Sequence, residues 1–176
     1  SGINTFDTAD VYSLGQSERR LGKILKERRN DVYIFSKAGS VMTYTETTLG
    51  EHDFSDNHLI SAINRSLKRL DTDYLDLFQI HMPPESEDDF KNVERAFEKI
   101  KSENKANYCG ISIGNQYEKG IELIERGFVD TLQIYFSLFD FNASKKLFQV
   151  AKKHNIGLIV AKPLAQGFLT GKYRNN

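Results

Sequence analysis

The chain has 176 residues, 39% of them hydrophobic, and its 24 basic and 24 acidic residues give a formal net charge of zero. This balance does not favour bulk electrostatic binding of nucleic acid, which needs an excess of basic surface. No apolar run is long enough to cross a membrane, and the single Cys109 excludes an intramolecular disulfide. We therefore expect one globular domain over residues 1–176 that is cytoplasmic and has neither nucleic acid nor membrane as a partner.

Six short segments rich in Val, Ile, Leu, Phe and Tyr predict β-strands. They are residues 3–6, 32–36, 74–81, 107–112, 129–136 and 156–162. Most of their apolar residues follow one another instead of alternating with polar ones. Both faces of each strand are therefore expected to be covered, as they are in a parallel sheet.

Between these strands, five segments predict amphipathic helices. They are residues 18–27, 57–70, 88–101, 118–126 and 143–153. In the second segment the apolar residues recur at helical spacing, and Ser55 or Asp56 is placed to cap the first turn. Gly127 and Gly157 fall where the fourth and fifth helices are expected to end.

The alternation of strands and helices predicts an α/β fold with a parallel sheet. By itself it leaves two architectures open, a closed β/α barrel and an open doubly wound sheet. An open sheet that binds a dinucleotide normally carries a G-x-G-x-x-G fingerprint after its first strand. The glycine-containing strings at residues 110–114 and 167–171 do not have that spacing. The barrel is therefore favoured.

Four polar residues fall at or just after the ends of expected strands. Asp7 follows the first strand and Tyr12 lies in the turn after it, whereas Lys37 and His81 close the second and third strands. In a β/α barrel the C-terminal strand ends converge on one face, and that face carries the active site. We therefore expect these four side chains to meet around one cavity.

This set of side chains suits proton donation to a carbonyl oxygen. Hydride addition to a carbonyl builds negative charge on the oxygen, which needs a proton or strong hydrogen bonds. A phenol has an unperturbed pKa of about 10, and a nearby ammonium makes it a better donor by stabilising the phenolate. Lys37 is placed to act in this way on Tyr12, with Asp7 holding the ammonium and His81 relaying a proton or orienting the substrate. Each residue also has a purely structural interpretation. Asp7 could cap a helix or turn, and Tyr12 could be an ordinary packed aromatic. Lys37 could be a solvated lysine at a strand end, and His81 a histidine in a loop.

Several ordered motifs resemble those of the aldo-keto reductases. They are Phe6-Asp-Thr-Ala-Asp-Val-Tyr12, Ile34-Phe-Ser-Lys37, Asp73-Tyr-Leu-Asp-Leu-Phe-Gln-Ile-His81, Gly110-Ile-Ser112, Leu132-Gln133 and Pro163-Leu-Ala-Gln-Gly-Phe-Leu-Thr-Gly-Lys-Tyr173. That family folds as a (β/α)8 barrel and reduces aldehydes and ketones with NAD(P)H and without a metal. The resemblance implies an α/β fold of the TIM-barrel type that is incomplete here, because the first and last β/α units are lacking. Both ends are expected to be cuts through a longer protein.

The resemblance also implies a role for each site residue. Tyr12 would be the proton donor, with Asp7, Lys37 and His81 as its partners, and no metal is expected. Ser112 and Gln133 would contact the nicotinamide carboxamide. The cofactor-binding residues implied in this way are Ser112, Gln133, Lys162, Pro163, Leu164 and Gly167. The implied cofactor is NADPH, with NADH as the alternative, and the implied partner is a small-molecule carbonyl substrate.

Two departures from the family's pattern leave other functions open. Ile113 stands where the family usually has Asn after the serine, and Lys162 stands where an aromatic commonly stacks on the nicotinamide. A second hypothesis is therefore a non-catalytic nicotinamide-binding module or redox sensor of the same fold. A third is that the segment closes no barrel and binds nothing. An isolated segment that lacks the last cofactor-binding loop is expected to be inactive.

Overall fold

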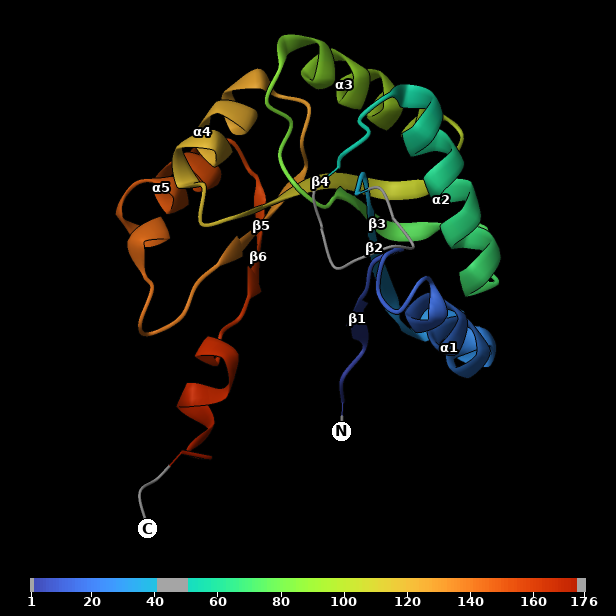
Figure 1. Cartoon of the computed structure of the whole chain (residues 1–176), viewed down its shortest axis with the longest axis horizontal. Helices are drawn as coiled ribbons and strands as arrows, with labels where there is room; N and C mark the ends of the chain where they lie inside the picture. Colours follow the sequence, from blue (N-terminus) through green and yellow to red (C-terminus); the bar gives the residue numbers. More distant parts are fainter. Residues whose placement is uncertain (1, 41–50, 174–176) are drawn as a thin grey trace. The chain divides into compact units, whose positions relative to one another are not determined.

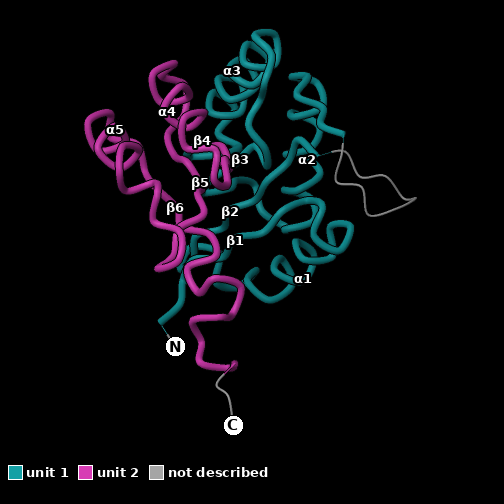
Figure 2. The backbone as a smooth tube through the Cα atoms, turned by 60° about the vertical axis from the view of Figure 1, so that its left-hand side comes forward, with its two compact units in different colours: residues 1–110 teal, residues 111–176 magenta. Residues whose placement is uncertain are grey.

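The computed structural model describes residues 2–40 and 51–173. The chain divides into two compact units, which Figure 2 distinguishes by colour: unit 1 is Ser1–Gly110 and unit 2 is Ile111–Asn176. The expected single domain over the whole chain stays a prediction. Within the described ranges, no helix combines the length and the apolar character that crossing a membrane requires.

Unit 1 alternates strands and helices in the order that the sequence predicts (Figure 1). Its strands are β1 (Thr5–Asp7), β2 (Tyr33–Ala38), β3 (Leu75–Ile80) and the first part of β4 (Ala106–Gly114). Its helices are α1 (Gln16–Leu25), the 3₁₀ helix η1 (Lys26–Asp31), α2 (Asp56–Leu70) and α3 (Glu87–Ser102). β2 pairs in parallel with both β1 and β3. The continuous apolar runs thus indicated the strand direction correctly.

The helices of unit 1 lie along one side of its strands and bury their apolar stripes there (Figure 1). Ser55 caps α2 as expected, because its Oγ accepts a hydrogen bond of 3.3 Å from the backbone N–H of His58. Phe78 of β3 and Phe97 of α3 are both buried, and their rings meet edge to face with centroids 6.5 Å apart. The core of unit 1 therefore lies between the sheet and these helices.

Helix α1 approaches the end of α2 without an intervening side chain. A Cβ added at Gly22 would lie 2.5 Å from the carbonyl oxygen of Leu70, a distance that no side chain tolerates. α2 stops at this point because Asp71 is left-handed, with φ 53°, and its N–H bonds to the carbonyl of Leu67. This close packing holds α1 against the end of α2, and the turn just before α1 carries Tyr12.

Arg29 ties together the N-terminal ends of β2 and β3. Its guanidinium donates to the carbonyl oxygens of Val32 and Tyr74 and to Oδ2 of Asp76, at 2.9–3.0 Å. The same Asp76 oxygen accepts from the N–H of Ile34 at 2.9 Å. One carboxylate therefore bonds both strands at the end of the sheet opposite Lys37 and His81.

Unit 2 repeats the pattern with shorter elements. Its strands are the end of β4, β5 (Thr131–Tyr135) and β6 (Gly157–Ala161), and its helices are α4 (Tyr117–Arg126), η2 (Asn142–Lys145), α5 (Leu147–Lys153) and η3 (Ala165–Thr170). β5 and β6 pair in parallel, with Tyr135 opposite Ala161. Leu132 and Ile134 of β5 are fully buried, as are Leu123 and Ile124 of α4 to within 1%.

Of the two glycines expected to end helices in unit 2, one does so and the other does not. Gly127 ends α4 with φ 82°, as expected. Gly157 does not end the fifth helix, because it is the first residue of β6. The left-handed residue after α5 is Asn155, with φ 57°. Asparagine adopts this conformation more readily than most residues, so the helix stops earlier than the glycine indicated.

Candidate active site

The strand register of unit 1 brings three of the expected residues to one edge of its sheet. Asp7 is the last residue of β1, and Lys37 of β2 lies opposite Gln79 of β3. His81 follows β3 directly, and its N–H donates to the carbonyl of Ala38 at 2.8 Å. Because parallel strands end at the same edge, their terminal side chains gather there.

Lys37 and Asp7 form an ion pair at this edge. Lys37 is 1% exposed, and its Nζ lies 2.6 Å from Asp7 Oδ2 and donates to the carbonyl of Thr8 at 2.8 Å. Burial lowers the pKa of Lys37, while the charge of Asp7 and its hydrogen bond oppose that change. The carboxylate therefore keeps a buried ammonium in position and favours its charged form.

Tyr12 and His81 complete the cluster. Nζ of Lys37 lies 5.5 Å from the centroid of the Tyr12 ring, and the rings of Tyr12 and His81 meet edge to face at 5.8 Å. Tyr12 is 42% exposed, so a substrate can reach its ring. All four residues that the sequence singled out thus lie together in unit 1.

His81 is electrically neutral at physiological pH. Burial, and then the nearby charge of Lys37, lower the pKa of its imidazole to about 4. A neutral imidazole carries one N–H donor and one acceptor nitrogen. It can therefore donate a hydrogen bond to a carbonyl oxygen without adding a positive charge to the site.

Gln79 belongs to this cluster although the sequence did not single it out. It is fully buried, and its Nε2 donates to Asp7 Oδ1 at 3.2 Å. Gln79 therefore holds the second oxygen of the carboxylate that pairs with Lys37. Its position offered a signal, because it is a polar residue two before His81 and so projects from the same face of the strand.

Two further acidic residues are buried close to the turn of Tyr12. Glu18 is fully buried and Asp10 is 5% exposed. Burial, and then the charge of Glu18, raise the pKa of Asp10 to about 6. The sequence placed Glu18 at the start of a helix and in the continuation of the motif that begins at Phe6, but no periodicity of α1 signals a buried charge.

In unit 2 the residues expected to contact the carboxamide occupy different environments. Ser112, near the end of β4, is half-buried, and Gln133 of β5 is 6% exposed. Ile113 is 1% exposed, and its Cδ1 lies 2.5 Å from the point where Gly120 of α4 would carry a Cβ. Ile113 therefore packs in the core of unit 2.

The segment after β6 is irregular and exposed. Lys162 and Gly167 have φ of 60° and 101°, and Leu164 is 53% exposed. Nζ of Lys162 lies 3.7 Å from the centroid of the Tyr135 ring, within the range of a cation–π interaction. Pro163 lies between these residues and is also exposed. The sequence did not single out Tyr135, although it is an aromatic at the end of a strand.

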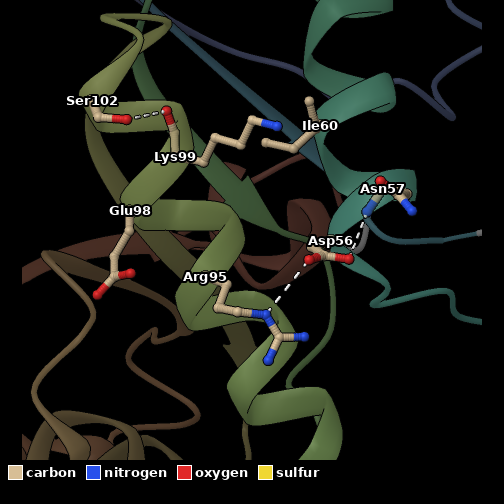
Figure 3. Close-up of a pocket in the computed structure, with 7 residues that line it drawn as sticks. All are labelled: Asp56, Asn57, Ile60, Arg95, Glu98, Lys99 and Ser102. Atoms are coloured by element: carbon tan, nitrogen blue, oxygen red, sulfur yellow. Dashed lines mark hydrogen bonds and ion pairs between the residues drawn. The ribbon is translucent and has the colours of Figure 1, made fainter.

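A separate hollow of about 470 Å³ lies between α2 and α3 on unit 1 (Figure 3). Asp56 and Arg95 face each other across it and form an ion pair at 3.5 Å. Lys99 and Glu98 add one charge of each sign to its wall. Because the charges of the hollow are paired, they favour neither an anionic nor a cationic ligand. The lining of the hollow includes no residue of the strand-end cluster.

Comparison with known proteins explains this arrangement. The sequence model of the "Aldo/keto reductase family" matches residues 1–176. The "Uncharacterized oxidoreductase YqkF" of Bacillus subtilis is 35% identical over 97% of this chain and 55% of its own length. The chain thus spans about half the length of a curated relative that it matches.

Solved structures agree with the sequence comparison. The "aldo-keto reductase AKR11C1" from Bacillus halodurans (holo form) matches 99% of this chain and 57% of its own, with a TM-score of 0.86 and 32% identity. An aldo/keto reductase from Klebsiella pneumoniae, solved in complex with NADP and acetate, matches 99% and 56%, with a TM-score of 0.77 and 25% identity. These similarities confirm the expected fold class, a β/α barrel of which the chain contains a part. The chain belongs to the aldo/keto reductase family.

Proposed function

We propose that the protein containing this chain is an NAD(P)H-dependent oxidoreductase that reduces an aldehyde or ketone to an alcohol. One observation carries the proposal: the buried Lys37–Asp7 pair lies beside the rings of Tyr12 and His81. Membership of the family supports the oxidoreductase class, and the Klebsiella complex supports NADPH as the cofactor. A reducing cytoplasm suits this activity and the buried thiol of Cys109.

The bound nicotinamide would supply a hydride to the carbonyl carbon. The residues of unit 1 would donate a proton and hydrogen bonds to the carbonyl oxygen. As negative charge builds on that oxygen, the hydroxyl of Tyr12 donates its proton to it. The ammonium of Lys37 stabilises the phenolate that remains, and Asp7 keeps the ammonium in place. The neutral imidazole of His81 orients the substrate by a hydrogen bond to the same oxygen. Tyr12 then recovers a proton from solvent, to which it is partly exposed.

Residues of unit 2 would hold the cofactor. Ser112 and Gln133 offer a hydroxyl and an amide, which together supply the donors and acceptors that a carboxamide needs. The exposed segment from Lys162 through Pro163 and Leu164 to Gly167 would contact the rest of the molecule. Lys162, Pro163 and Leu164 are exposed, so their side chains are accessible to a ligand. Ile113 stands where the family usually has an Asn that contacts the carboxamide. Ser112 and Gln133 would therefore make the hydrogen bonds to the carboxamide without that third residue.

The test is Tyr12→Phe in the full-length protein that contains this chain. We expect kcat to fall by about a hundredfold or more, because a general acid typically contributes that much. Binding of NADPH, followed by its fluorescence, should stay unchanged. Tyr33→Phe is the matched control, since Tyr33 is an exposed tyrosine at the N-terminal end of β2. Equal turnover of the Tyr12 variant and the wild type would refute the mechanism.

The second candidate is a nicotinamide-binding module or redox sensor without turnover. The burial of Ile113 in the core favours it, because a nicotinamide with fewer contacts is oriented less strictly for hydride transfer. Tight binding of NADPH together with no turnover over a broad panel of aldehydes and ketones would support this candidate. In that case Tyr12→Phe would change neither property.

A further inference from the structure

The turn that carries Tyr12 is strained. Ser13, Leu14 and Gly15 follow Tyr12 and have φ of 49°, 54° and 78°. The left-handed conformation is unfavourable for residues with a Cβ, and consecutive left-handed residues are rare. Such a turn persists only where its surroundings determine it. The neighbours of this turn therefore decide where Tyr12 lies.

Arg69 of α2 is packed directly against the turn. A Cβ added at Gly15 would lie 2.7 Å from Cδ and 2.9 Å from Nε of Arg69. The guanidinium pairs through Nε with Oε2 of Glu18 at 2.5 Å, and its Nη2 donates to Oγ of Ser66 at 3.2 Å. The side chain of Arg69 is 11% exposed and that of Glu18 is fully buried. The turn therefore rests on a buried ion pair.

The same ion pair reaches the strand that carries Lys37. Oε1 of Glu18 accepts a hydrogen bond of 2.6 Å from Ser36, the residue before Lys37. On the turn itself, the N–H of Asp10 donates to the carbonyl of Lys37 at 3.0 Å. One buried carboxylate thus connects the segment of the phenol with the segment of the ammonium.

We propose that Glu18 and Arg69 are positioning residues, which hold the phenol of Tyr12 at its working distance from Lys37. Neither residue touches the reacting atoms in this arrangement. The inference rests on the proposed function for its effect on turnover. A buried ion pair adds little net stability over an apolar pair of similar volume, so stability alone does not account for it.

The test replaces both partners at once, with Glu18→Gln and Arg69→Met in the full-length protein. Gln keeps an acceptor for Ser36 and Met fills the space of the arginine stem, so neither charge of the pair is left buried without the other. We expect kcat to fall about ten- to a hundredfold, because small misplacements of a reacting group cost that much. The KM for NADPH should stay unchanged. Amide hydrogen exchange in residues 10–17 should become about tenfold faster or more, while that of β3 stays the same.

A second ion pair in unit 1 provides the matched control. Arg29 and Asp76 are each 13% exposed and join the opposite ends of the strands. Arg29→Met with Asp76→Asn removes that pair but keeps an acceptor for the N–H of Ile34. We expect this variant to leave kcat and the exchange of residues 10–17 unchanged. Arg69→Lys, which keeps a cation beside Glu18, should lose less turnover than Arg69→Met.

The two readouts separate the inference from the proposed function. A folded double variant with wild-type kcat and wild-type exchange in the turn would overturn the inference. If the wild type itself shows no turnover, the proposed function fails, and exchange in residues 10–17 still decides whether the pair holds the turn. If the double variant does not fold, Arg69→Lys takes its place. It keeps a cation beside Glu18 but loses the planar guanidinium that also bonds Ser66, and smaller changes of kcat and exchange in the same direction are expected.

Discussion

The strand-end cluster of unit 1 and the segment after β6 in unit 2 hold their candidate site residues in different ways. In unit 1, Lys37 and Glu18 are almost entirely buried, and both form ion pairs with partners far along the chain. In unit 2, Leu164 is 53% exposed, and Lys162 contacts the ring of Tyr135 at the protein surface. The first region is held by buried ion pairs, whereas the second is an exposed backbone segment with a cation–π contact at the surface.

This difference matters for the cost of substitution. A buried charge that loses its partner costs several kcal/mol, whereas an exposed charge costs a fraction of one. A change in the cluster of unit 1 should therefore affect turnover strongly, and should affect stability where it leaves a buried charge without its partner. A change in the exposed segment of unit 2 should affect cofactor affinity, and only weakly. One type of substitution, made in both regions, tests this comparison.

Lys37→Met should have the largest effect. It removes the ammonium beside Tyr12, and we expect kcat to fall about a hundred- to a thousandfold, as when a preorganised donor is lost. Stability should change little, because the buried charge disappears and Asp7 is partly exposed. Steady-state kinetics and urea unfolding measure the two quantities. Turnover close to that of the wild type would show that Lys37 is only a structural lysine.

Asp10→Asn should reveal a pH dependence in the same region. Burial raises the pKa of Asp10 from 3.8 to about 6, so the native protein binds its proton more tightly than the unfolded chain does. The stabilisation is present at low pH and is lost as the pH rises from about 4 to about 6. The free energy of unfolding of the wild type, relative to Asp10→Asn, should fall by up to about 3 kcal/mol over this window.

Urea unfolding of both proteins at several pH values measures this difference. His81 acts in the opposite direction, because its pKa is lowered to about 4 and its contribution is lost as the pH falls. It contributes equally to both proteins and cancels in the comparison. A difference independent of pH would mean that Asp10 titrates normally and that its carboxyl is not buried in solution.

Gly22→Ala should have a smaller effect, on stability alone. The new Cβ would meet the carbonyl oxygen of Leu70, which is backbone and cannot rotate away. We expect the free energy of unfolding to fall by about 1–3 kcal/mol, the usual cost of overpacking. Lys23→Ala, at the next and exposed position of α1, serves as the control in the same urea experiment. A Gly22 variant as stable as this control would contradict the close packing of α1 on α2.

Lys162→Met should have the smallest effect and completes the comparison with Lys37→Met. It removes an exposed cation from the face of Tyr135, an interaction worth about 0.5–1 kcal/mol. We expect the affinity for NADPH to change by about fivefold or less, with kcat preserved. Fluorescence titration and steady-state kinetics measure the two. A loss of kcat as large as that of Lys37→Met would show that the two regions do not differ as proposed.

The sequence predicted the strands and helices well where a strong periodicity marks them. The expected helix at residues 57–70 corresponds to Asp56–Leu70, and the expected strand at 74–81 to Leu75–Ile80. The sequence was a poorer guide to the end of a helix, where either glycine or asparagine can adopt the left-handed conformation. Asn155, and not Gly157, is left-handed after α5, because more than one residue can adopt that conformation.

The candidate site was predictable to the extent that it depends on strand ends. Tyr12, Lys37 and His81 were found from their places in the chain, and the roles assigned to them stay predictions. Gln79 could also have been found from strand alternation. The ion pair of Glu18 with Arg69 could not be predicted from the sequence. The two residues are 51 positions apart, and each lies on a helix whose other charged residues are mostly exposed.

The sequence by itself determined the order of strands and helices and, to within two residues, where the strands end, because both follow from local periodicity. Only the tertiary structure decided which charges are buried and with which partners. A charge enters a protein interior only where a partner is within bonding distance. For Glu18 that distance depends on how closely α1 packs on α2 over Gly22, a contact that no local pattern specifies.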